Sequence, residues 1–126
     1  MPFSPDIKTE IRKSFVSTTD ATATPIANIV VPANSVFTIK TFVSGSRSGG
    51  ASGTAGDSAG YEIFGTFKNV SGIISQVGST TKTANEDQVA WDCDFSISGA
   101  VVTVFVKGAS GNSVDWSSLT TIYKVQ

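Results

Sequence analysis

The chain has 126 residues, of which 40% are hydrophobic and 15% are charged, and its formal net charge is −1. A chain of this length forms one domain and buries a core without the help of disulfides. Basic residues form no patch that would recruit nucleic acid, and no acidic tail would recruit a basic partner. One cysteine and no histidine exclude an intrachain disulfide, a zinc site and a histidine-dependent catalytic triad.

The sequence predicts neither a secretory signal nor a membrane-spanning helix. The N-terminal region has no apolar run of signal-peptide length. No stretch reaches the roughly 18 apolar residues that a membrane helix needs. We therefore expect a protein that is made in a cytosol, makes no membrane contact, and stays soluble until it assembles or is released with the cell contents.

Residues 1–12 contain two prolines and little periodicity, which predicts an extended N-terminal arm ahead of a single domain at 13–126. The arm has apolar side chains but no strand pattern that would bury them in its own domain. We expect them to become ordered on a neighbouring subunit or on the surface that the protein binds. These side chains include Phe3, Ile7 and Ile11.

Alternating apolar and polar residues predict a series of strands separated by polar turns. The fifth strand is expected to be bulged at Gly78. Seven or eight strands without a helix predict an all-β fold, either an antiparallel β-sandwich or a jelly roll. The expected strands are 13–19, 26–31, 35–44, 61–70, 73–83, 89–97, 101–107 and 114–125.

The clearest of these patterns is the hairpin at 89–108, whose two strands are joined by a turn at Gly99. On its first strand every large apolar side chain falls on one face, so we assign that face to the core. The side chains are Val89, Trp91, Cys93, Phe95 and Ile97. In this position Cys93 is a small core residue and not a catalytic thiol, which would need a histidine.

The segment 44–60 holds half of the glycines and no apolar side chain larger than alanine. Such a segment buries too little surface to offset its ordering entropy, so a mobile loop is expected. Its spaced glycines invite comparison with a phosphate-binding loop. No Lys-Ser/Thr pair and no helix follow, so the surface loop is the favoured interpretation.

Two other patterns are candidate sites. Asp92 and Asp94 share a strand face and could act as acid and base or hold calcium, but a solvated strand face explains them better. Trp116 follows a polar turn, so it could be exposed and bind a sugar or a protein, whereas Trp91 lies in the core alternation. The sequence thus predicts no catalytic residue, no cofactor and no metal site, and the protein is expected not to be an enzyme.

Several strands also place a large apolar group on the face opposite the core, for example Val36. Taken together, these groups suggest that part of the second face meets another chain. The candidate partner-binding residues are Phe3, Ile7, Ile11, Phe42, Phe64, Phe105 and Trp116.

A resemblance to a known family rests on turn glycines and apolar alternation over residues 20–126. Its motifs include Gly60-Tyr61-Glu62, Val104–Gly108 and Val114-Asp115-Trp116. A Pro-x-x-Ser turn at residues 32–35, followed by a long strand, is a further matching motif. The chain resembles a β-domain that recurs in tailed-phage virion proteins, both head decoration proteins and the ends of tail fibres. The other matching positions are Gly65, Phe67, Lys68, Val77, Gly78, 90–97, Gly99 and Gly111.

This resemblance implies a structural protein of a phage virion that is assembled in the host cytoplasm. Because only some twenty residues precede the module, a stand-alone capsid decoration (cement) protein is favoured over a fibre tip. The implied partners are further copies of the chain, as a homotrimer, and the major capsid protein or another virion protein. The alternative is a receptor- or carbohydrate-binding module of a tail fibre or tail tip, and a hydrolase is a distant third.

Overall fold

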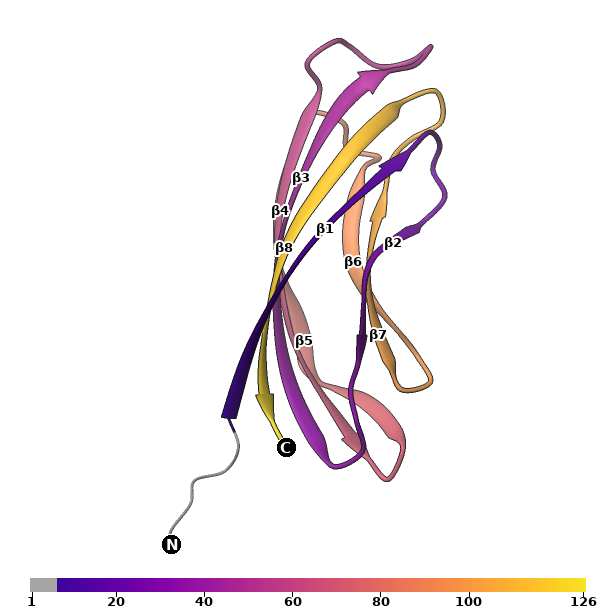
Figure 1. Ribbon diagram of the computed structural model, residues 1–126. Coiled ribbons are helices and arrows are strands. Elements are labelled where there is room, and N and C mark those ends of the chain that lie inside the picture. The colour runs from indigo at the N-terminus through magenta and orange to yellow at the C-terminus, as the bar shows by residue number, and fades with distance from the viewer. Residues whose placement is uncertain (1–6) are drawn as a thin grey trace, which may run out of the picture.

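A computed structural model describes residues 7–126 as eight strands in two facing sheets, with no helix in that range (Figure 1). All strand pairs are antiparallel. One sheet has the order β1-β8-β3-β4-β5 and the other β2-β7-β6, so the expected all-β antiparallel sandwich is confirmed. The strands are β1 (Ile7–Thr18), β2 (Thr24–Val30), β3 (Ser35–Gly49), β4 (Ser58–Val70), β5 (Ile73–Glu86), β6 (Asp92–Ser98), β7 (Val101–Lys107) and β8 (Ser113–Val125).

The core lies between the sheets and follows the alternation of the strands, which turns every second side chain inward. Trp91 and Cys93 are buried, as the sequence predicts. The rings of Trp91 and Trp116 meet edge to face, with centroids 5.6 Å apart. The most deeply buried side chains include Ile29, Phe37, Ile39, Ile63, Phe67, Val102, Val104 and Ile122.

The inward assignment of the first hairpin strand fails at both of its ends. β6 begins only at Asp92, and Val89, which precedes it, is 89% exposed. Along the strand the cover declines from Cys93, which is fully buried, to Ile97, which is 41% exposed. Alternation identifies the inward face of a strand but not how far the opposite sheet extends over it. The alternating pattern therefore continues beyond the part of the strand that is buried.

Trp116 is not a surface residue. It is fully buried, and its indole N–H donates to the hydroxyl of Thr18 at 2.9 Å. Gly45 lies opposite it on β3, and a Cβ added there would come within 2.5 Å of the indole ring. The expectation that Trp116 is exposed is therefore wrong, because a glycine on the neighbouring strand makes room for the ring inside the sandwich.

The N-terminal strand starts six residues earlier than expected. β1 begins at Ile7 and pairs with β8 without a register shift. Residues 7–12 therefore belong to the five-stranded sheet and not to an arm, because β8 is long enough to pair with them. Residues 1–6, and with them Phe3, lie outside the described residues.

Most of the glycine-rich segment is also ordered. β3 continues to Gly49 and β4 starts at Ser58, which leaves a loop only at 50–57. The Arg47 guanidinium donates to the carbonyls of Ser52 (3.0 Å) and Gly50 (2.8 Å), and so holds that loop against the strand end. The loop expected over 44–60 is therefore confirmed only at 50–57, because the serine and glycine residues on either side of it pair as strands.

β5 carries the expected bulge. Phe64 and Thr66 of β4 lie opposite Thr81 and Val77, so the three residues 64–66 of β4 span the five residues 77–81 of β5, and Gly78 has a φ of 77°. The strand then runs on to Glu86. The polar turn expected at 83–87 is therefore strand over most of its length, because those polar residues pair with β4 at the edge of the sheet.

Candidate interaction surface

The face of the five-stranded sheet that points away from the other sheet is called the outer face here. Its apolar side chains are numerous and come from all five strands, with exposed fractions from 39% for Leu119 to 73% for Ile73. Single exposed apolar residues are normal on a protein surface, but a set that spans a whole sheet marks an interaction site. The set comprises Ile11, Phe15, Val36, Phe42, Phe64, Val70, Ile73, Val77, Leu119, Tyr123 and Val125.

Lysines interrupt the apolar side chains of the outer face. Lys13, Lys40 and Lys68 point outward from β1, β3 and β4. Lys40 lies 5.1 Å from the centre of the Phe42 ring and 4.0 Å from the carboxylate of Glu62. Long lysine side chains can lay their methylene groups along an apolar surface and keep the ammonium in water. The outer face is therefore wettable in the free chain and still rich in apolar area.

Phe42 forms a ridge between two shallow hollows of the outer face. The hollow on the β8 side has a volume of about 360 Å³ and is lined by Lys13, Ser117 and Leu119 among others. The hollow on the β4 side has about 290 Å³ and includes Gly60 in its lining. The small side chains of Ser44, Ser117 and Gly60 lie in register across three strands and leave Phe42 standing above them. A raised aromatic beside two hollows suits contact with a second protein surface.

The predicted partner-binding residues do not form one surface. Ile11, Phe42 and Phe64 lie on the outer face. Phe105 is half-buried on β7 of the other sheet, so the sandwich separates it from them. Trp116 is in the core, Ile7 belongs to β1, and Phe3 lies outside the described residues.

Sequence reasoning missed part of the outer face. Phe15 is 66% exposed, and Tyr123 and Val125 are each 46% exposed. The alternation of residues 119–125 was visible, but the choice between the inward and outward face of β8 depends on Trp116 and Ile122. Once those two are placed in the core, the period of two assigns the outward side chains directly.

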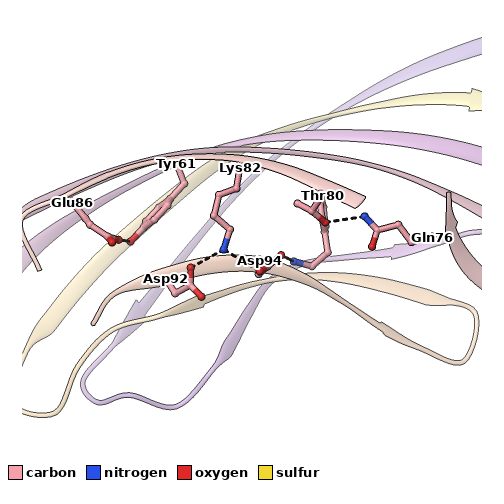
Figure 2. Close-up of polar contacts among 8 residues, drawn as sticks. Tyr61, Gln76, Thr80, Lys82, Glu86, Asp92 and Asp94 are labelled. Atoms are coloured by element: carbon pink, nitrogen blue, oxygen red, sulfur yellow. Dashed lines mark hydrogen bonds and ion pairs between the residues drawn. The ribbon is translucent and has the colours of Figure 1, made fainter. Parts of the chain in front are cut away.

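A polar cluster closes the side of the sandwich between β5 and β6 (Figure 2). The Lys82 ammonium reaches from β5 to the carboxylates of Asp92 and Asp94, at 3.0 Å each. Burial alone would lower the pKa of Lys82, but its bonds to the two carboxylates outweigh that effect and raise it. The pair that the sequence offered as an acid–base or calcium site is thus bonded to one lysine and links the two sheets.

Beside this cluster the buried Tyr61 donates its hydroxyl to Glu86, as Figure 2 shows. Burial, and next the hydrogen bond to Glu86, raise the pKa of Tyr61 far above its usual value. Burial likewise raises the pKa of the Cys93 thiol to about 12. Neither group offers a nucleophile or a base at neutral pH.

A second polar cluster lies on the opposite side of the sandwich, between β1 and β2. Glu10 accepts hydrogen bonds from Arg12 and Lys124, and these bonds lower its pKa to about 2. Arg12 also donates to the carbonyl of Asn28 on β2, at 2.9 Å. Both open sides of the sandwich are therefore tied by ion clusters that point between the sheets.

The described residues bring no group of three or more acidic, cysteine or histidine side chains together as a metal site. Among residues 7–126, no helix is long and apolar enough to span a membrane. The largest surface feature that the geometry offers is the outer face, which can bind a protein by burying its apolar side chains.

No known family model and no curated protein matches this sequence. Similar solved structures include the tailspike protein gp49 of Acinetobacter baumannii bacteriophage Fri1, a capsular polysaccharide depolymerase, at 19% identity and a TM-score of 0.42. The tailspike protein of Acinetobacter baumannii phage AM24 is 11% identical, with a TM-score of 0.48. A protein of the Bacillus endospore appendages, a family of disulfide-linked pili, is 15% identical, with a TM-score of 0.39.

The three likenesses differ in how much of the other protein they involve. They cover 93%, 94% and 98% of this chain, but only 17% and 26% of the two tailspike chains, against 93% of the appendage protein. With TM-scores below 0.5, none of them establishes a common fold or a function for this chain.

Proposed function

We propose that the protein is a structural component of a phage virion that works by protein–protein contact and not by catalysis. The single observation that carries this proposal is the outer face, where exposed apolar side chains extend across all five strands of a sheet. The resemblance in sequence to tailed-phage virion β-domains supports the assignment to a virion. A rigid sandwich with one binding face is what an assembly protein needs.

In its finer form the proposal is a homo-oligomeric capsid decoration (cement) protein, and the resemblance implies a trimer. The alternative is a receptor- or carbohydrate-binding tail module, which the same resemblance implies and for which an exposed Trp116 was the candidate aromatic platform. That residue is buried, so the alternative loses its aromatic platform. Co-purification with capsids would support the decoration protein, whereas specific binding on a glycan array would support the tail module.

The mass of the protein in solution, measured by light scattering over a wide concentration range, tests whether the outer face drives self-association. The parent chain is expected to be oligomeric, and the double variant Phe42→Ser/Phe64→Ser is expected to have a lower mass than the parent, with an unchanged fold. The control variant, Val30→Ser/Val89→Ser, removes two exposed apolar side chains that lie off the outer face and should keep the parent mass. A parent chain that stays monomeric at high micromolar concentration would contradict self-association.

A further inference from the structure

The two sheets have four edge strands, and three of them carry features that prevent a further strand from pairing. β2 contains Pro25, which has no N–H, and its register shifts next to that residue. β5 is bulged at Gly78. β6 is short, and the Asp94 carboxylate takes the backbone N–H of Phe95 at 2.8 Å.

β1 is the exception among the four. It pairs with β8 over its whole length of 12 residues without a bulge, and it contains no proline. Two large apolar side chains, Ile11 and Phe15, are 64% and 66% exposed on its outward side. A long, straight and apolar edge of this kind is a template for another strand unless something specific covers it. The protective features of β1 are its charges: Glu10 and Arg12 point inward, and Lys8 and Lys13 lie on the same strand.

We propose that β1 pairs antiparallel with β1 of a second copy of the chain, so that two five-stranded sheets join into one sheet across a two-fold axis. The proposal rests on the self-association proposed above but departs from the trimer that the resemblance implies, because a two-fold contact gives a dimer or another even-numbered oligomer. Such an axis stands perpendicular to the sheet, so the outer faces of the two copies lie side by side. Paired residues then point to the same side, and their residue numbers must add up to an even sum.

The charges on β1, together with the length of the pairing, select one register among the even sums. A sum of 18 pairs Glu10 with Lys8 of the second copy but joins only residues 7–11, and sums of 28 and above bring no opposite charges together. A sum of 20 places Glu10 opposite its own copy, a sum of 24 does the same for Arg12, and a sum of 26 for Lys13. Each of these places like charges directly opposite each other, which is destabilising. A sum of 22 instead places Glu10 opposite Arg12 of the second copy, twice by symmetry, and Ile11 opposite Ile11. The charges that reject an unrelated apolar strand therefore match a second copy.

This register covers residues 7–15 and buries Ile11 at its centre. It also leaves Phe42 and Phe64 accessible, since they lie on inner strands of the sheet. The edge contact and the outer face are thus separate surfaces. A chain can use the edge for its own copy and the outer face for another protein, or both for itself.

Cysteine cross-linking tests the register in the full chain. Residues directly opposite each other across antiparallel strands have Cβ atoms about 4.5–5.5 Å apart, close enough for a disulfide. Ile11→Cys should therefore form a covalent dimer under mild oxidation. The yield of covalent dimer from Lys13→Cys should be at least about tenfold lower, because the two copies of residue 13 would lie about 13 Å apart along the strands. An equal mixture of Thr9→Cys and Lys13→Cys should cross-link as a heterodimer, because these two positions face each other.

The parent chain is the blank in this experiment, because its single thiol, Cys93, is fully buried. Equal cross-linking of Ile11→Cys and Lys13→Cys would overturn the register and with it the proposal. An oligomer by light scattering without an Ile11→Cys cross-link, or an odd-numbered oligomer such as a trimer, would overturn the edge contact but leave the proposed function standing. A monomer without a cross-link would overturn the edge contact and self-association together.

Discussion

The two edge strands of the five-stranded sheet, β1 and β5, differ in how they limit pairing with a further strand. At each edge an ion cluster points between the sheets: Glu10, Arg12 and Lys124 on the β1 side, and Lys82 with two aspartates on the β5 side. Both clusters reach the other sheet, through the carbonyl of Asn28 on β2 and through Asp92 and Asp94 on β6. The edges differ in their backbones, because β5 is bulged and β1 is straight.

This difference separates two tasks that inward-pointing charges can perform. On β5 the cluster closes the sandwich, and the bulge at Gly78 by itself prevents another strand from pairing. On β1 there is no bulge, so the charges alone decide what may pair with the edge. Such an edge can pair with a strand whose charges are complementary and repels strands whose charges are not, so repulsion contributes to the specificity of pairing.

The largest effect should come from breaking the middle of the sheet that both edges share. Gly45→Ala places a Cβ within 2.5 Å of the buried Trp116 ring, so the ring must move. We expect the free energy of unfolding to fall by about 1–3 kcal/mol, as for other overpacked cores. Chemical denaturation measures the loss, and hydrogen exchange should show both edges losing protection together.

Gly60→Ala is the matched control for that substitution. Gly60 lies in the neighbouring strand β4, and a Cβ added there meets nothing within 4 Å. The variant should be as stable as the parent or gain up to about 1 kcal/mol, since alanine loses less entropy than glycine in a strand. An equal loss in both variants would contradict the close packing of Trp116 on Gly45.

The next effect concerns the bulge. Deleting Gly78 and Ser79 removes the two extra residues and restores a continuous β4–β5 register without changing which side chains face inward. The straightened β5 edge should then pair with other chains, so sedimentation velocity should show species larger than those of the parent. A deletion variant that folds and keeps the parent mass would mean that the inward Lys82 protects the β5 edge by itself.

The sequence predicts the position of a side chain well where its own strand determines that position, and poorly where a neighbouring strand does. Alternation assigned the inward faces of β3, β4 and β7 correctly, because most of their large apolar residues fall on one side. It failed for β8, where Trp116 and Ile122 lie on one face and Leu119 and Tyr123 on the other. The inward face of β8 is determined by Gly45 on the neighbouring strand, which makes room for Trp116. The residues of β8 alone do not predict that pairing.

The candidate site shows the same limit. Phe42 and Phe64 could be found from their own strands, since each stands opposite a recognisable core face. The edge property of β1 could not, because it depends on where the strand lies in the sheet and on Pro25, Gly78 and Asp94 in the other edge strands. That β1 lacks a bulge and a proline becomes informative only when it is compared with the other three edge strands.

A smaller effect is expected from the ion cluster on the β5 side. Lys82→Met leaves Asp92 and Asp94 without their shared cation, and the stability should fall by about 1 kcal/mol, because partly exposed ion pairs contribute little. Protection from hydrogen exchange should fall at β6 more than at β1. Lys40→Met, which removes the 4.0 Å pair with Glu62 on the outer face, is the control and should change stability by about 0–0.5 kcal/mol. Equal losses in the two variants would mean that the β5 cluster does not link the sheets.

The smallest effect distinguishes the two ion clusters by pH. The bonds from Arg12 and Lys124 hold the pKa of Glu10 at about 2, below its ordinary value of 4.5. A carboxyl with a lowered pKa stabilises the fold fully above the ordinary value, and this contribution is lost as the pH falls toward the folded value. The melting temperature of the parent should therefore exceed that of Glu10→Gln by a few degrees near neutral pH, and the gap should close between about pH 4.5 and pH 2.

Lys82 should give the opposite curve, because its pKa is raised above the ordinary value of 10.5. Its contribution is complete below that value and is lost only as the pH rises through the higher folded value. The gap between the parent and Lys82→Met should hence persist from neutral pH to about pH 10.5 and close at higher pH. A gap for Glu10→Gln that stays constant down to pH 2 would show that the Glu10 carboxylate does not stabilise the β1 side. The charges on β1 would then serve only to select the strand that pairs with it.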